Sequence, residues 1–108
     1  MIYLASPYSH KNPAIRSARY HAAFAYASYA MSRGEVIFSP IVYGHEFAIN
    51  GHAQTDHLWW QRFNERILLA ATELRVLQLV GWDDSLGVTH EIEFAERHLI
   101  PISYEGPL

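Results

Sequence analysis

The sequence predicts an α/β fold in which helices flank a four-stranded parallel sheet. Short apolar runs alternate with longer amphipathic or alanine-rich segments along the 108 residues, which is the pattern of alternating strands and helices. Turn-forming residues separate these segments, and no internal repeat is present. Because strands joined through helices run parallel with right-handed crossovers, this order predicts a single sheet covered by helices.

Each expected element has a local signal at its ends. Asn12 followed by Pro13 is typical of a helix start, since Asn caps a helix and Pro fits its first turn. Gly34 ends that helix, and Thr55 or Asp56 begins the next one. In chain order, the strands are expected at 2–5, 36–38, 74–80 and 100–103, the helices at 13–33, 56–71 and 88–98, and a long functional loop at 41–55.

The whole chain, 1–108, is expected to form one domain with a flavodoxin-like or Rossmann-like arrangement of three layers. Such sheets bind ligands outside the carboxyl ends of their strands. The loops at that edge begin with Ser6-Pro7-Tyr8, with Ser39-Pro40 and with the segment from Gly81 to Asp84. We therefore expect the functional residues in these three loops.

Composition argues against several classes of function. Eight basic and 11 acidic residues give a net charge of −3 without any run of Lys or Arg, so we expect no binding to nucleic acid. The apolar runs are far shorter than the ~20 residues of a membrane-spanning helix, so we expect no membrane association. No secretory leader opens the sequence, which favours a cytoplasmic protein.

Metal and nucleotide-cofactor motifs are also missing. The chain contains no cysteine, and the spacings of its histidines, including His45, His52 and His57, match no usual metal motif. The glycines form neither a dinucleotide-binding fingerprint nor a P-loop. We therefore expect no metal and no organic cofactor, although His45 and His52 can still contact a ligand from the long loop.

The last expected helix carries a carboxylate at the ligand edge. Its apolar stripe is expected at Val88, Ile92, Ala95 and Leu99. Glu91 lies about 60° to one side of this stripe and near the helix start, where backbone N–H groups favour an ionised carboxylate. Such a carboxylate can act as a nucleophile or a base. The alternative is that Glu91 only occupies a first helical turn, where acids are common.

Two segments, Ile2 to Tyr8 and Gly81 to Ala95, resemble the nucleoside 2-deoxyribosyltransferase-like superfamily. Within it, the chain is most similar to a group of small bacterial and phage proteins of unassigned function. The resemblance covers most of the chain in order, but the middle, 41–56, matches the characterised enzymes poorly. The resemblance implies the same α/β fold and a site built from both matching segments.

The resemblance also implies roles for individual residues. In the characterised family, a strand-end tyrosine orients a glutamate that attacks C1′ of a deoxyribose, and these positions match Tyr3 and Glu91. An aspartate of the acidic loop assists the departing base, and both Asp83 and Asp84 match it. A sugar-contacting aspartate on the second helix is replaced here by Asn64.

The implied activity is cleavage or transfer of the N-glycosidic bond of a nucleoside or a nucleoside 5′-monophosphate. Asp56 or Glu65 would have to replace the missing sugar-contacting acid. A carboxylate beside C1′ stabilises an oxocarbenium-like state and can trap the sugar covalently, while a second acid protonates the base. No metal or organic cofactor is required for this chemistry.

Further side chains are expected to contact this substrate. Arg16 and Arg19, which follow the serine-rich first loop, can hold a 5′-phosphate or form an exposed pair on a solvated face. Trp82 or Tyr8 can stack on a nucleobase or simply cover the sheet edge. The expected substrate-binding residues are Ser6, Pro7, Tyr8, Ser9, Arg16, Arg19, Ser39, Asp56, Asn64, Trp82, Ser85 and Gly87.

Two other functions stay open at this point. The same cleft can hold a nucleotide without cleaving it, as a binding or sensor module, and Asn64 slightly favours this alternative. The chain can also be an interaction protein that works through an aromatic helix face. Trp59 and Trp60 cannot both point inward, so one is expected in the core and the other at a subunit contact of a homodimer or larger homo-oligomer. The family resemblance implies a site partly completed by the neighbouring subunit.

Overall fold

The computed structural model describes residues 1–51 and 56–108 of the chain. Strands and helices alternate along these residues, as the sequence predicts. In chain order the elements are β1 (Ile2–Ala5), α1 (Pro13–Ser32), β2 (Ile37–Phe38), α2 (Pro40–Asn50), α3 (His57–Leu69), β3 (Glu73–Leu77), a 3-10 turn η1 (Trp82–Asp84), α4 (Leu86–Arg97) and β4 (Ile102–Glu105).

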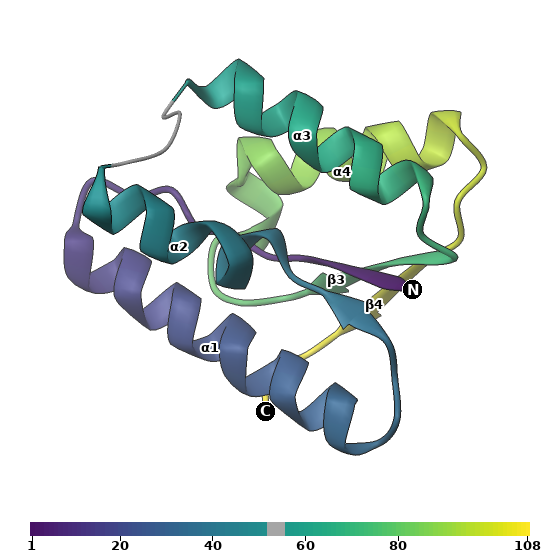
Figure 1. Ribbon diagram of the computed structural model, residues 1–108, viewed down its shortest axis with the longest axis horizontal. Coiled ribbons are helices and arrows are strands. Elements are labelled where there is room, and N and C mark those ends of the chain that lie inside the picture. Colours follow the sequence, from purple (N-terminus) through teal and green to yellow (C-terminus); the bar gives the residue numbers. More distant parts are fainter. Residues whose placement is uncertain (52–55) are drawn as a thin grey trace.

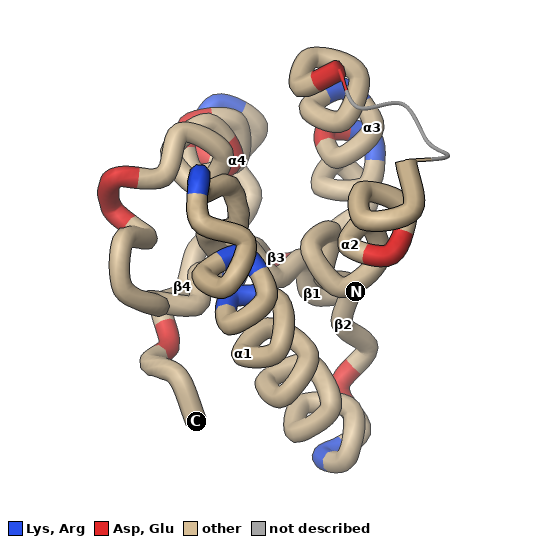
Figure 2. Tube along the Cα trace, turned by 90° about the vertical axis from the view of Figure 1, so that its left-hand side faces the viewer, with Lys and Arg blue, Asp and Glu red and all other residues tan. Residues whose placement is uncertain are grey.

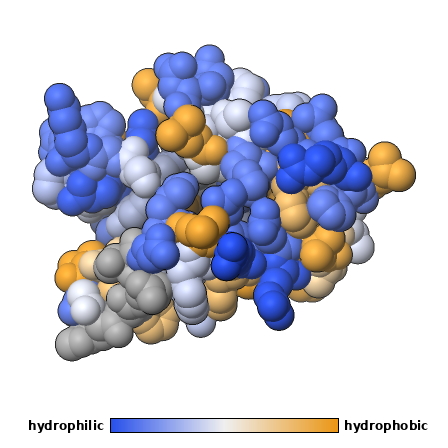
Figure 3. All heavy atoms as spheres, turned by 90° about the horizontal axis from the view of Figure 1, so that it is seen from above, coloured by the Kyte–Doolittle hydropathy of each residue, from blue (hydrophilic) through white to orange (hydrophobic). Residues whose placement is uncertain are grey.

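The four strands form one parallel sheet in the order β2-β1-β3-β4. Figure 1 shows α1 on one side of the strands and α3 with α4 on the other, so the molecule has three layers. The expected α/β class and the parallel sheet are confirmed. From above, as in Figure 3, the outer surface over α3 and α4 is mostly hydrophilic with isolated hydrophobic residues, as amphipathic helices require.

Each face of the sheet has its own hydrophobic core, because successive strand residues point to opposite faces. Tyr3 packs on the α3–α4 side, with Val88 and Phe94 of α4. The next residue, Leu4, packs on the α1 side. The buried positions of α1 include Ala23, Ala27 and Ala30, whose small side chains let this helix lie close to the sheet.

The expected loop at 41–55 is wrong, because helix α2 occupies residues 40–50. Ser39 caps this helix by accepting a hydrogen bond from the N–H of Val42, Pro40 occupies its first turn, and Gly51 ends it in a left-handed conformation with φ of 67°. These are the same signals that identified α1. Residues 52–55, including His52 and Thr55, lie outside the described part, and Asp56 caps α3.

The expected apolar stripe of the last helix is also partly wrong. Leu99 is 90% exposed and lies beyond the end of α4, with a φ of 57°. Phe94 is buried in its place, together with Val88 and Ala95. The helix ends earlier than expected because His98 is its C-cap, and a residue after the cap no longer follows the helical period.

The chain leaves β1 and β3 towards opposite faces of the sheet. Helix α1 follows β1 on one face and α4 follows β3 on the other, while β1 and β3 lie side by side. In open α/β sheets, such a switch point leaves a crevice at the carboxyl ends of the strands, where ligands bind. Among the described residues, no helix is both long and apolar enough to cross a bilayer.

Candidate functional site

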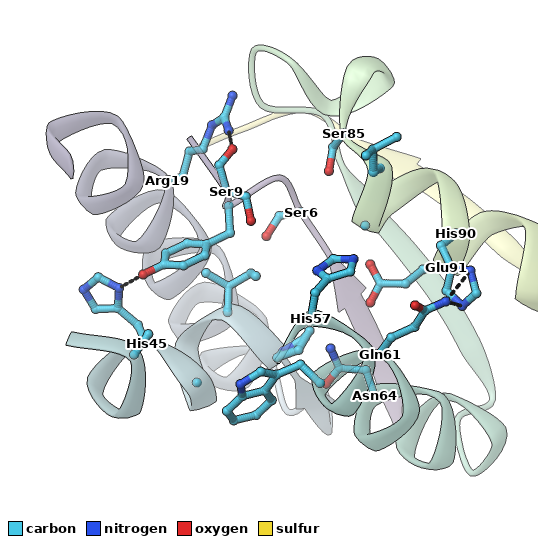
Figure 4. Close-up of a pocket in the computed structure, with 18 of the residues that line it drawn as sticks. Ser6, Ser9, Arg19, His45, His57, Gln61, Asn64, Ser85, His90 and Glu91 are labelled. Atoms are coloured by element: carbon cyan, nitrogen blue, oxygen red, sulfur yellow. Dashed lines mark hydrogen bonds between the residues drawn. The ribbon is translucent and has the colours of Figure 1, made fainter. Parts of the chain in front are cut away.

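A cleft of about 860 Å³ lies at this switch point. One face each of α2, α3 and α4 lines it, together with the loop after β1 (Figure 4). Helix α3 contributes six positions that recur with the helical period, so one whole face of this helix lines the cleft. These positions are His57, Trp60, Gln61, Asn64, Glu65 and Leu68.

Glu91 forms the inner wall of this cleft with Tyr3 behind it. The fully buried Tyr3 hydroxyl donates a hydrogen bond to Oε2 of Glu91, and Figure 4 shows the carboxyl group of Glu91 directed into the cleft. Burial raises the pKa of Glu91 to about 7, and the hydrogen bond from Tyr3 lowers it in part. Burial and the neighbouring carboxylate raise the pKa of Tyr3, so the phenol stays protonated and remains a donor.

One end of the cleft is suited to an anion. Arg19 donates from Nη1 to the carbonyl oxygen of Ser9 at 2.9 Å and from Nη2 to that of Val80 at 3.3 Å. Nearby Ser6 is 5% exposed, and its Oγ has no hydrogen-bond partner among residues 1–51 and 56–108. Figure 2 shows basic positions in the first half of α1 and acidic ones in the loop before α4.

The start of α4 lies at the same end. Ser85 caps this helix, with its Oγ accepting a hydrogen bond from the N–H of Val88 at 3.2 Å. Gly87 in the first turn lines the cleft without a side chain to block the backbone. Helix starts present free N–H groups and a positive dipole end, both of which favour a bound anion.

The other end of the cleft holds an ionisable pair. His90 Nε2 lies 2.8 Å from Oε2 of Glu65, and the Nε2 atom of Gln61 lies 2.7 Å from His90 Nε2 and 2.9 Å from Nδ1. A carboxylate only accepts hydrogen bonds, so Nε2 of the imidazole carries the proton towards Glu65. In Figure 4, Gln61 and His90 lie on the far side of Glu91 from Ser9 and Arg19.

The wall formed by α2 is fixed by a buried histidine. Tyr8 and His45 share a hydrogen bond of 2.7 Å between the phenol and Nδ1, and His45 stacks on Tyr20 with ring centroids 4.0 Å apart. Burial lowers the pKa of His45, which keeps the imidazole neutral so that Nδ1 can accept from the phenol. The ring of Tyr8 is therefore held in a fixed position at the edge of the cleft.

Nine of the residues expected at the site line this cleft, and Tyr3 lies directly behind one of them. The nine are Ser6, Tyr8, Ser9, Arg19, Asn64, Asp84, Ser85, Gly87 and Glu91. Asn64 contributes a buried Oδ1 that has no hydrogen-bond partner in the part of the chain described. A buried polar atom without a partner is costly, so this atom and Ser6 Oγ are suited to a polar ligand.

The other expected residues do not line the cleft. Those outside it are Pro7, Arg16, Ser39, Asp56, Trp82 and Asp83. Trp82 packs on Tyr104 and on the core of the α3–α4 face, which is the covering role weighed as its alternative. Arg16 donates to the carbonyl oxygen of His10, and Ser39 and Asp56 cap helices. Asp83 is exposed in η1.

Several lining residues were missed by sequence reasoning, chiefly on α2 and α3. The expectation that Trp59 or Trp60 lies in the core is wrong: Trp59 is 43% exposed, and Trp60 lines the cleft. The helical recurrence of polar and aromatic residues from His57 to Glu65 was the available signal. It could not be assigned to a cleft because the position of α2, the opposite wall, was unknown.

No cluster of three or more histidine, cysteine or acidic side chains suited to a metal ion occurs in 1–51 or 56–108. A search of curated proteins finds no match to this sequence. A family model described as a domain of unknown function, DUF1937, matches residues 1–105. The match covers nearly the whole chain, including both walls of the cleft, and the chain therefore belongs to the DUF1937 family.

Proposed function

We propose that this protein cleaves the N-glycosidic bond of a nucleoside 5′-monophosphate, or transfers its sugar, through a covalent bond between C1′ and Glu91. The observation that carries the proposal is the hydrogen bond from the buried Tyr3 hydroxyl to Glu91 at the inner wall of a large cleft. A partly desolvated carboxylate is a stronger nucleophile than a fully solvated one. Perturbed carboxyl groups in clefts are typical of catalytic sites.

The proposed reaction has two steps. Glu91 Oε attacks C1′, the C1′–N bond breaks, and its electron pair leaves with the base, which receives a proton. Water or a second base then attacks C1′ and releases the carboxylate. The oxocarbenium-like transition states of both steps carry positive charge next to Glu91, as in retaining glycosidases.

The anion end of the cleft favours a phosphorylated substrate. Arg19, the unpartnered hydroxyl of Ser6 and the first turn of α4 converge there and leave donors for a phosphate. Asn64 offers a buried amide oxygen to a sugar hydroxyl. The substrate then lies with its phosphate beside Arg19 and its sugar between Asn64 and Glu91.

The test is release of free base from ribo- and deoxyribonucleosides, each with and without a 5′-phosphate. We expect release from nucleotides and a loss on the order of 10³-fold or more in Glu91→Gln, because the nucleophile is removed. Glu93→Gln, on the exposed face of the same helix, is the matched control and keeps full activity. Equal turnover in Glu91→Gln and wild type would exclude Glu91 from the reaction.

Binding without cleavage is the second candidate function, and the amide of Asn64 favours it. An amide beside the sugar supplies no negative charge to help stabilise a developing cation. A sensor would be stabilised by nucleotides in a thermal-shift assay while all of the added nucleotide is recovered intact. Base release in the preceding assay decides between the two functions.

The same proposal includes a homodimer and a cytoplasmic location, where nucleotides are available. Helices α2 and α3 carry an aromatic face that consists of Tyr43, Phe47, Trp59 and Phe63. The rings of Tyr43 and Phe63 stack at 5.7 Å and those of Trp59 and Phe63 at 5.5 Å, yet Tyr43 and Trp59 are 48% and 43% exposed. Such a patch is suited to a subunit contact.

A further inference from the structure

We infer that His90, backed by Glu65, is the acid that protonates the departing nucleobase, and that the Gln61–Glu65–His90 end of the cleft is the base-binding end. This inference rests on the proposed function and concerns the direction in which the substrate lies. Gln61 and Glu65 of α3 meet His90 of α4 at the wall of the cleft. His90 directly precedes Glu91 in the sequence.

The order of groups along the cleft supports this direction. Arg19 and Ser85 mark the anion end, Glu91 lies between, and Gln61 with His90 lies beyond it (Figure 4). A nucleotide has the same order of phosphate, C1′ and base. With the phosphate beside Arg19 and C1′ beside Glu91, the base extends towards Gln61 and His90.

The position of Asp84 makes it a poor acid for this base. Asp84 precedes the cap residue Ser85, so it lies at the start of α4, on the anion side of the cleft. From Leu86, the first residue of α4, to His90 the helix rises about 6 Å at 1.5 Å per residue. In Figure 4, His90 and Gln61 instead lie on the side of Glu91 to which the base extends.

The hydrogen bonds of His90 are those of an acid held ready for proton transfer. Glu65 accepts from Nε2 at 2.8 Å, so a proton that His90 delivers to the base comes from Nδ1. The amide nitrogen of Gln61 lies 2.7 Å from Nε2 and 2.9 Å from Nδ1, and an incoming base displaces it from Nδ1. Both carboxyl and imidazole are about one quarter exposed, so the pair is open to the cleft.

Protons and electron pairs balance over the two steps of the reaction. The Nδ1 proton passes to a ring nitrogen or exocyclic oxygen of the base while the C1′–N electron pair moves onto the base and Glu91 forms its bond to C1′. In the second step, neutral Nδ1 takes a proton from water, whose oxygen attacks C1′ and releases Glu91. The imidazolium is thereby restored, and Glu65 remains a carboxylate throughout.

The test compares two leaving groups on one sugar phosphate. The natural nucleotide needs a proton on its base, whereas the 4-nitrophenyl 2-deoxyriboside 5-phosphate releases a stable anion without one. We expect His90→Asn to lose at least ~100-fold in kcat/KM on the nucleotide but less than ~10-fold on the aryl glycoside. Glu65→Gln should show the same selectivity with a smaller loss, and Glu93→Gln should lose nothing.

The ratio of the two kcat/KM values for one variant does not depend on the fraction of folded enzyme, so a destabilised His90→Asn remains informative. Equal losses on both substrates would refute the acid role of His90, and a selective loss in Asp84→Asn instead would assign it to Asp84. Absence of base release by the wild-type protein, or failure to cleave the aryl glycoside, would refute the proposed function itself.

Discussion

At the scale of single residues, the phenol of Tyr3 affects the ionisation of the candidate nucleophile, Glu91. Tyr3 is buried in the core beneath α4, and its hydroxyl has Glu91 as its acceptor. The hydrogen bond lowers the pKa of Glu91, while burial raises it to about 7. Burial is the larger of these two opposing effects, and together they set the pH at which the carboxylate forms.

This balance predicts the pH dependence of the reaction. The attacking group is the ionised carboxylate, so kcat/KM should rise with pH through about 7. In Tyr3→Phe the lowering effect is lost, so the rising limb should move to higher pH by about 1–2 units, the equivalent of a hydrogen bond to a charged group. Rates measured from pH 5 to pH 9 give this shift.

A structural role alone would not move the rising limb. Tyr104→Phe, which alters a half-exposed tyrosine outside the cleft, is the control and should leave the pH profile in place. A Tyr3→Phe protein with lower activity but the wild-type pH midpoint would show that the phenol does not set the ionisation of Glu91.

At the scale of elements, the loops between strands and helices place the anion end. Gly81 has a φ of 90°, and a Cβ on it would lie 2.7 Å from Nη2 of Arg19. The left-handed backbone favours glycine at this position, and an added Cβ would also displace the end of the flexible Arg19 side chain. The loop after β3 therefore contacts Arg19 of α1, whose Nη2 donates a hydrogen bond to the carbonyl oxygen of Val80.

Gly81→Ala should therefore have two effects. The backbone strain should lower the free energy of unfolding by about 1–2 kcal/mol. Displacement of Arg19 should raise the KM for a nucleoside 5′-monophosphate about tenfold while the KM for the unphosphorylated nucleoside stays the same, because one charge-assisted hydrogen bond is lost. Denaturant unfolding and initial rates on both substrates measure these effects.

Gly34→Ala is the matched control. Gly34 has a φ of 86°, but nothing lies within 4 Å of the position of an added Cβ. This variant should lose similar stability and keep both KM values. An unchanged preference for the phosphorylated substrate in Gly81→Ala would remove Arg19 from the phosphate site.

At the scale of the whole molecule, the aromatic face of α2 and α3 predicts self-association. Trp59→Ser removes the largest aromatic ring of this face, and Trp59 is not part of the buried core. We expect wild-type protein to sediment as a dimer at micromolar concentration and Trp59→Ser to sediment as a monomer. Leu99→Ser, which changes an exposed leucine outside this face, should remain dimeric. A monomeric wild-type protein would contradict the prediction.

Local patterns predicted the class of fold and most of the helix starts. Asn12-Pro13 begins α1 as expected, and Asp56 caps α3. The missed helix α2 shows the limit of this reasoning, since its Ser39-Pro40 start and Gly51 end were present but were read as parts of a loop. Element ends were displaced by several residues because caps and strand pairing, rather than composition, fix them.

The sequence by itself determined the alternation of strands and helices, the parallel sheet and the sheet edge at which the cleft lies, since these follow from periodicity and chain order. It also singled out Tyr3 and Glu91, which the structure joins by a hydrogen bond across 88 positions of the chain. Only the tertiary structure decided that α2 and α3 form the opposite wall and that Glu65, Gln61 and His90 meet. Contacts between distant helices depend on how whole faces pack, and no local pattern encodes that.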